Sequence, residues 1–192
     1  QKLNFTNEGG YGNTYRFLKN IMGLWMIQSL RHEYDDKYSF AELCSMAEEE
    51  KEFPSRVDVN ATCFLAPENM TEEVMKWCKE SGQKVPETVG QQAAVIYQSL
   101  AECYGKTIRE IESITGKTYN AIHIIGGGSN ADYLNQLTAK CTGKTVIAGP
   151  GEATAIGNIL AQMIKAGEFK NLKQARKCVK NSFKIKYFES GK

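Results

Sequence analysis

The chain has 192 residues, of which 42% are hydrophobic and 24% charged, as expected for a soluble globular domain with its own core. Its 24 basic and 22 acidic residues leave a net charge of +2, which argues against the strongly basic surface of a nucleic-acid-binding protein. The apolar runs are too short to cross a bilayer, and no signal peptide opens the chain. The missing initiator methionine suggests processing or a piece excised from a longer protein.

The cysteine and histidine pattern argues against a zinc site. Six cysteines are scattered without a C-x-x-C pair, and the two histidines are His32 and His123. Such spacing does not supply a cluster of zinc ligands. In a chain without secretion signals, free and buried thiols are the expected state of the cysteines.

The N-terminal part is expected to begin with a loop and to continue as a long helix. Residues 1–12 are polar and rich in glycine, which is typical of a strand end or a loop. Apolar residues then recur at helical spacing, which predicts a helix over residues 15–34 with residues 13–14 near its N-terminus. Gly23 costs such a helix about 1 kcal/mol relative to alanine, so a packing role is expected for it.

Three more helices are expected in the first two thirds of the chain. Ser39 and Glu42 have the spacing of a capping box, which predicts a helix over residues 39–50. A short helix is expected over residues 71–81 and a much longer one over residues 87–115, where apolar residues follow three-to-four spacing. The irregular stretch between the first two is expected to pack through Val57, Val59, Phe64 and Leu65.

The last third alternates strands and helices. Residues 121–125 are apolar at nearly every position, which predicts a buried strand, and residues 145–148 predict a second strand. Helices are expected over residues 131–141, 152–165 and 172–180. This order is typical of two parallel strands with a right-handed crossover, and therefore of an α/β fold. Since no repeat or low-complexity linker interrupts the chain, residues 1–192 are expected to form one domain.

Three consecutive glycines, Gly126, Gly127 and Gly128, follow the first strand and are the sharpest functional motif. Without Cβ atoms the backbone can approach a ligand, and the N-terminus of the next helix suits a phosphate or another polar group. The alternative is a tight turn in which Ser129 or Asn130 caps the helix. The motif also matches the dinucleotide fingerprint G-x-G-x-x-A, but the next strand lacks the acidic residue that would hold a ribose.

Other features favour structural roles. Small residues in the segment 149–158 are expected to let the following helix pack closely on a sheet or on another helix. His123, within an apolar strand, is expected to be a hydrogen-bonded structural residue. Asn20 and Gln28 would lie about 80° and about 12 Å apart on the expected first helix and could face one cleft, although isolated polar residues are more often solvated. No residue pattern indicates a nucleophile or a general base.

Two blocks of the sequence resemble a known family. The first comprises residues 5–10 (FTNEGG) and 15–25 (YRFLKNIMGLW), and the second comprises residues 125–137 (from IGGGS to LNQL) and 148–159 (AGPGEATAIGNI). Together they resemble the C-terminal half of sugar kinases of the FGGY family, in the actin/hexokinase/Hsp70-like superfamily. Within that family the first block resembles the enzymes that act on L-rhamnulose. The resemblance is weak over residues 35–85.

The resemblance implies a helix-rich C-terminal lobe of the ribonuclease H-like ATPase fold, with a partial sheet, in a cytoplasmic two-lobed kinase. ATP and Mg²⁺ would lie between the lobes and the sugar deep in the cleft, where a catalytic aspartate takes a proton from the sugar hydroxyl that attacks the γ-phosphate. Carried over by position, the residues expected to bind are Asn20 for the sugar, Gln28 for ATP, and Gly126, Gly127, Gly128 and Asn130 for adenosine.

The same resemblance implies that part of the machinery lies elsewhere. The family's catalytic aspartate, N-terminal phosphate loop and Gly-Thr phosphate motif do not occur in this sequence and are expected upstream of residue 1. The chain alone is therefore expected not to phosphorylate L-rhamnulose and to bind ATP or ADP weakly. Its expected partner is its own N-terminal lobe, and neither a nucleic acid nor a membrane is expected. Two alternatives stay open, namely another ketose kinase of the xylulose or fuculose type and a noncatalytic actin-like interaction domain.

Overall fold

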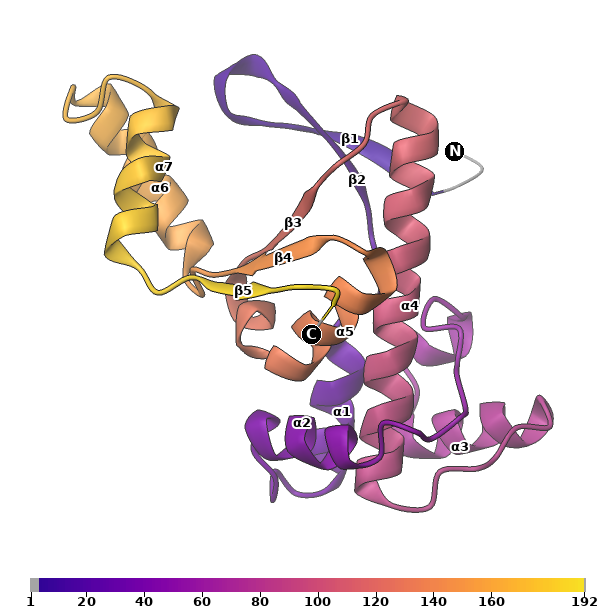
Figure 1. The fold of residues 1–192 in the computed structure, drawn as a ribbon. Helices are drawn as coiled ribbons and strands as arrows, with labels where there is room; N and C mark the ends of the chain where they lie inside the picture. Colours follow the sequence, from indigo (N-terminus) through magenta and orange to yellow (C-terminus); the bar gives the residue numbers. More distant parts are fainter. Residues whose placement is uncertain (1–3, 192) are drawn as a thin grey trace.

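The computed structural model describes residues 4–191, which form seven α-helices and five β-strands (Figure 1). The helices are α1 (Trp25–Glu33), α2 (Phe40–Glu49), α3 (Met70–Glu80), α4 (Val89–Thr115), α5 (Asp132–Thr142), α6 (Ala153–Lys165) and α7 (Leu172–Ser182). The strands are β1 (Phe5–Gly9), β2 (Tyr15–Lys19), β3 (Ala121–Ile124), β4 (Thr145–Ala148) and β5 (Lys186–Phe188). Within the described residues, no helix combines the length and the apolar character needed to span a bilayer.

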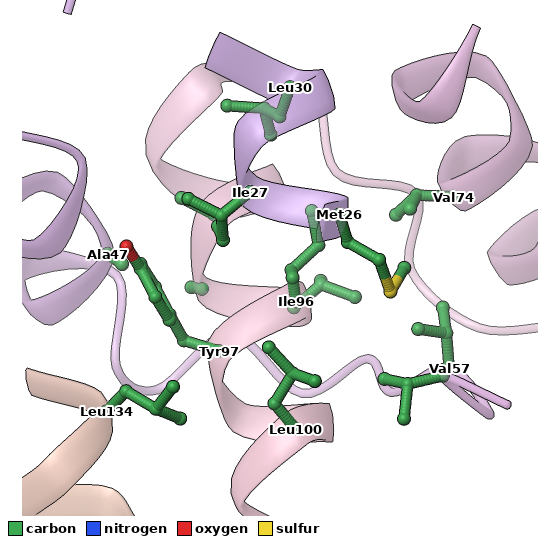
Figure 2. Close-up of a cluster of buried hydrophobic side chains, with 14 of the residues drawn as sticks. Met26, Ile27, Leu30, Ala47, Val57, Val74, Ile96, Tyr97, Leu100 and Leu134 are labelled. Carbon is green, nitrogen blue, oxygen red and sulfur yellow. The ribbon is translucent and has the colours of Figure 1, made fainter. Parts of the chain in front are cut away.

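The core surrounds the N-terminal half of α4. This helix begins after Thr88, whose hydroxyl accepts a backbone hydrogen bond, and ends at Gly116, which adopts a left-handed conformation with φ +66°. Its fully buried side chains include Ile96, Tyr97 and Leu100, which lie among side chains from α1, α2 and α5 (Figure 2). The long helix predicted from apolar spacing is therefore confirmed, and it forms the axis of the core.

Helix α2 begins with the capping box that the sequence predicts. The Ser39 hydroxyl accepts a hydrogen bond from the Glu42 amide, and the Glu42 carboxylate accepts one from the Ser39 amide, which completes the capping box of α2. Helix α3 begins at Met70 after a cap that was not predicted, since the Asn69 side chain accepts a hydrogen bond from the Glu72 amide. Between these helices Val57, Val59 and Phe64 are buried as expected, but Leu65 is 66% exposed and does not pack into the core.

The main sheet has three strands in the order β3–β4–β5. Strands β3 and β4 are parallel and are joined through α5, as the sequence predicts. Strand β5 pairs antiparallel with β4 and was not expected from the sequence. The burial expected for β3 is wrong, because its residues are only partly covered and the His123 side chain is exposed, with no structural hydrogen bond to it among the described residues.

The helix expected over residues 15–34 is also wrong in its first part. Residues 15–19 form β2, which pairs antiparallel with β1, and the helix α1 begins only at Trp25. The rings of Phe5 and Phe17 stack with centroids 4.7 Å apart across this hairpin. Cross-strand pairing therefore overrides a helical spacing of apolar residues, and Gly23, with φ +66°, turns the chain into α1.

Helices α6 and α7 pack on each other and stand apart from the helical core (Figure 1). No residue of α6 is buried, and in α7 only Ala175 is. Of the two neighbours expected for α6 from its small residues, a sheet or another helix, the structure provides the helix α7, but this contact leaves no residue of α6 buried. The small residues leave the first turns of α6 open instead.

All six cysteines are free thiols, as expected, but most are not buried. Cys78 lies in the core, where burial raises the pKa of its thiol above the ordinary value, and Cys178 is exposed. The other four are partly covered.

Candidate functional site

Two glycine-rich segments meet at the carboxyl end of the parallel strands. Residues 126–130 follow β3 as a 3₁₀ turn, and residues 149–151 follow β4. The Gly126 amide donates to the Pro150 carbonyl at 3.2 Å, and the Gly149 amide donates to the Ile124 carbonyl at 2.8 Å. In open α/β sheets, ligands bind outside the carboxyl ends of parallel strands. The fold therefore brings two distant motifs together at the edge where such sheets bind their ligands.

Two neighbouring glycines of the first segment differ in what glycine provides. Gly126 has a φ of +73°, which residues with a Cβ rarely adopt. At Gly127 the φ is not left-handed, yet a Cβ placed there would have no other atom within 4 Å. The space above Gly127 is therefore open to a ligand that approaches the backbone closely.

Buried polar side chains hold the glycine turn from its interior side. The Ser129 hydroxyl donates to the Gly126 carbonyl at 2.7 Å, and the Asn135 side-chain amide donates to the Ser129 carbonyl at 3.2 Å. Both side chains are buried. Asn130, by contrast, is exposed, and its amide nitrogen lies 4.0 Å from the position that a Cβ on Gly151 would take. The turn is preorganised, and the exposed side-chain amide of Asn130 lies beside the second glycine segment.

Helix α5 fixes this arrangement to the core. The ring of Tyr133 packs edge-on against Tyr97 of α4, with centroids 5.9 Å apart. Burial raises the pKa of Tyr133 to about 12, so its hydroxyl stays protonated at neutral pH. This anchor lies two residues from Asn135, and therefore ties the glycine turn to the longest helix of the core.

The N-terminus of α6 forms the other side of the site. The helix starts at Ala153, and its N-cap residue, Glu152, makes no capping hydrogen bond through its side chain. Its first turns carry the small residues Ala153, Ala155 and Gly157, so the backbone amides are sterically accessible. The free amides of a helix N-terminus carry partial positive charge and can donate hydrogen bonds to an anionic or polar ligand.

Helix α1 approaches the glycine turn through its first residues. A Cβ on Gly128 would lie 3.6 Å from the Cδ1 atom of Leu24. Gln28 is one helical turn further on, because its amide donates to the Leu24 carbonyl at 3.0 Å, and its side chain is exposed. Gln28 therefore lies on the helix that borders the glycine turn.

Asn20 is placed differently from its prediction. It follows β2 and precedes α1, so the helical separation of about 12 Å that was expected between Asn20 and Gln28 is wrong. Its side chain is exposed and makes no described contact with the glycine turn. Sequence reasoning also missed the pairing of the two glycine segments, although the signal was present, since each segment directly follows a predicted parallel strand.

The chemistry of the site is that of backbone donors and open space. Residues 126–130 and 149–151 carry no charged side chain. Within residues 4–191 no group of three or more histidines, cysteines or carboxylates is placed to hold a metal ion. The side chains present therefore do not fit a Mg²⁺ site, whereas the glycine turn and the helix N-terminus offer backbone N–H donors to a polar or anionic ligand.

Comparison with known proteins gives the family of the chain. Residues 2–166 match the model of the FGGY family of carbohydrate kinases, C-terminal domain. The chain is 50% identical over 187 residues to a rhamnulokinase of Halalkalibacterium halodurans, which covers 97% of the chain and 40% of that relative. It is 49% identical over 185 residues to a rhamnulokinase of Bacillus subtilis, with 96% of the chain and 38% of that relative covered.

The likeness extends over the whole chain but not over the whole of the relatives. A rhamnulokinase of Ligilactobacillus salivarius matches 100% of the chain at 48% identity, and 40% of its own length is covered. The chain thus spans about two fifths of the length of the curated relatives it matches. The helix-rich α/β structure with its small mixed sheet confirms the expected C-terminal lobe of the actin/hexokinase-like fold. The chain belongs to the FGGY family of carbohydrate kinases, in the C-terminal domain of that family.

Proposed function

We propose that residues 1–192 are the nucleotide-binding domain of a cytoplasmic kinase that transfers the γ-phosphate of ATP to the 1-hydroxyl of L-rhamnulose. The observation that carries this proposal is the meeting of two glycine segments at the carboxyl edge of β3 and β4, beside an uncapped helix N-terminus. The relatives named rhamnulokinase, at 41–50% identity, support the choice of sugar.

The proposed roles follow the placement of the residues. Gly126, Gly127 and Gly128 would bind adenosine along the open face of the turn, with Asn130 near the adenine. Gln28 would contact ATP from α1, which borders that turn through Leu24. The residue proposed for sugar contact is Asn20, which precedes α1 and is exposed.

Phosphoryl transfer depends mainly on positioning and on charge stabilisation. Residues of this chain would bind and orient the nucleotide through backbone amides. Mg²⁺ would neutralise phosphate charge when bound, and its ligands and the base that takes the sugar proton are proposed to lie in the rest of the enzyme. We therefore expect the 192-residue chain alone to show no sugar-dependent turnover in a coupled kinase assay and to bind ADP weakly in calorimetry. Turnover above background, or low-micromolar ADP affinity, would contradict this division.

A valine at Gly127 in the full-length enzyme tests the proposed site. Because the φ of Gly127 is not left-handed and its Cβ space is empty, Gly127→Val should leave the fold intact and fill the space assigned to adenosine. We expect the KM for ATP to rise at least about tenfold, since one lost or blocked contact of a few kcal/mol has that effect. The melting temperature should change little.

The matched control is Gly9→Val. Gly9 also has open space around its Cβ position and no left-handed φ, but it lies in the β1–β2 hairpin. This variant should keep the wild-type KM for ATP. An unchanged KM in Gly127→Val would show that the adenosine lies elsewhere. A panel of ketoses offered to the full-length enzyme tests the sugar, and a preference for a xylulose or fuculose substrate would overturn the assignment to L-rhamnulose.

A further inference from the structure

A cavity that shares no residue with the glycine turn lies beside α4. It has a volume of about 530 Å³ and is lined by residues of α4, by the end of β2, by residues 57–60 and by Cys141 of α5. Neither residues 126–130 nor residues 149–151 line it. Cavities of this size bind small organic molecules, so this α4 cavity is large enough for a ligand of its own.

Two cations that line the α4 cavity have no counterion. Lys19 pairs with the Glu110 carboxylate at 2.6 Å, whereas Lys106 and Arg109 form no ion pair with any residue that the structure describes. Residues three apart on a helix are neighbours on its surface, with Cβ atoms about 5–6 Å apart. The Arg109 guanidinium is turned back along α4, since its Nη1 atom lies 3.4 Å from the position that a Cβ on Gly105 would take. The two positive charges can therefore meet one ligand group.

Residues 57–60 bring hydrogen-bond acceptors to the same cavity. The Asp58 carboxylate accepts a hydrogen bond from the Asn60 amide at 3.1 Å through Oδ1, and the Asn60 side chain donates through Nδ2 to the Cys103 sulfur at 3.2 Å. Each side chain is thus held in place and keeps one oxygen without a partner among residues 4–191. Such oxygens accept hydrogen bonds from hydroxyl groups. Because the other lining carboxylate, Glu102, pairs with Arg56 at 2.8 Å, the unpaired charges of the lining leave a positive excess.

The walls of the α4 cavity are fixed to each other. The Val57 amide donates to the Ser99 hydroxyl at 2.9 Å, and that hydroxyl donates to the Val95 carbonyl at 2.6 Å. All three residues are buried, so they hold residues 57–60 against α4. The Lys19 and Glu110 side chains, which are only 15% and 17% exposed, hold the end of β2 in the same way. A preformed cavity loses little conformational entropy when a ligand binds.

We propose that the α4 cavity binds a small sugar phosphate, with its phosphate on Lys106 and Arg109 and its hydroxyls on Asp58 and Asn60. A phosphate monoester carries about two negative charges at neutral pH and accepts charge-assisted hydrogen bonds from both kinds of cation. An unphosphorylated sugar leaves the two cations without a counterion, and a simple anion leaves the two acceptors unused. This site is separate from the glycine turn, and it does not require that the turn binds ATP.

Lysine acetylation of the full-length enzyme tests the site, with fructose 1-phosphate as the probe and mass spectrometry as the readout for each lysine. At a probe concentration about ten times its Kd, we expect Lys106 to react about tenfold more slowly, because the bound phosphate covers its amine. Lys173 of α7 is the internal reference, since it is exposed and also has no ion pair within the described residues. A rate at Lys106 that millimolar probe leaves unchanged would overturn the proposal.

Two further ligands identify the group that the cavity recognises. Inorganic phosphate should protect Lys106 only at higher concentrations than fructose 1-phosphate, because it has no sugar hydroxyls for Asp58 and Asn60. Fructose should give no protection, because it brings no charge to Lys106 and Arg109. Equal protection by inorganic phosphate would replace the proposed sugar phosphate by a simple anion, and protection by fructose would refute the role of the cations.

Paired substitutions test the two cations directly. Lys106→Met combined with Arg109→Met removes both charges and keeps good helix formers on α4. In calorimetry of the full-length enzyme, we expect this double variant to lose a binding event for fructose 1-phosphate that the wild type shows. The matched control is Lys173→Met with Arg176→Met, which removes the same residue types at the same spacing from the exposed face of α7. Equal isotherms for the two double variants would contradict the proposal.

The two double variants share any binding of the probe at other sites, so their difference reports the α4 cavity alone. Neither measurement uses ATP. A failure here is therefore distinct from an unchanged KM in Gly127→Val.

Discussion

Helices α2–α4 and helices α6–α7 show similar amphipathic patterns, yet they have very different surroundings. The first group encloses a core of fully buried side chains such as Leu43, Val74 and Leu100. In the second group α6 has no buried residue and α7 has one, Ala175. The comparison shows that an amphipathic pattern predicts a helix and its apolar face, but does not say whether anything covers that face.

The candidate site lies between these two regions. Its glycine turn is anchored to the core side through Asn135, while its second segment opens into α6 on the exposed side. A ligand bound there would touch both a rigid element and one with few tertiary contacts. Substitutions that compare the stability of the core with that of α6 therefore also compare the two sides of the site.

The largest expected difference comes from truncating one apolar residue in each region. Leu100→Ala removes a fully buried side chain of α4 and should lower the free energy of unfolding by about 2–5 kcal/mol. Ile159→Ala removes a side chain of α6 that is 55% exposed and should change it by less than about 0.5 kcal/mol. Urea unfolding of both variants measures the contrast. A loss of more than about 2 kcal/mol in Ile159→Ala would mean that α6 is covered in solution.

A second pair of variants should change stability in opposite directions. A Cβ at Gly105 of α4 would lie 3.0 Å from the Cys141 carbonyl oxygen, so Gly105→Ala should force α4 and α5 apart and cost about 1–2 kcal/mol. At Gly157 of α6 a Cβ meets nothing within 4 Å, so Gly157→Ala should stabilise the helix by about 0.5–1 kcal/mol. Thermal unfolding of the two variants shows whether each change in stability has the expected sign. A more stable Gly105→Ala would show that α4 and α5 move apart at little cost.

The smallest expected effect concerns pH. The Lys144 ammonium lies 2.7 Å from the Glu112 carboxylate, and this hydrogen bond, together with one from the Tyr119 amide, lowers the pKa of Glu112 below its ordinary value of 4.5. Because the folded pKa is the lower one, the ion pair stabilises the fold above pH 4.5 and loses this effect as the pH falls through the folded pKa. It ties the C-terminal part of α4 to the residue that precedes β4.

The measurement compares Glu112→Gln with the wild type across this range. The wild type should melt at a higher temperature at pH 7, and the difference should shrink steadily below pH 4.5. Glu49→Gln, on the exposed face of α2, is the control and should track the wild type. A difference that stays constant down to pH 3 would show that the Glu112 carboxylate is not the source of the effect.

Much of the fold could be predicted because it depends on local signals. The capping box at Ser39, the apolar spacing of α4 and the parallel order of the last third all act within a few residues or through chain connectivity. Two predictions failed for one reason. The first turns of the expected helix became β2 because β1 pairs with it, and α6 has no buried residue because it lies against α7 and outside the helical core.

By itself, the sequence determined most of the helices, the capping box of α2, the parallel strand pair and the resemblance to FGGY kinases, because each rests on spacing or on residue type. Only the tertiary structure decided which motifs meet. The Gly126 amide reaches the Pro150 carbonyl because β3 and β4 run parallel and end at the same edge. Likewise, the α4 cavity joins the end of β2, residues 57–60, α4 and the end of α5, which lie far apart in the chain, and no local pattern records that they meet.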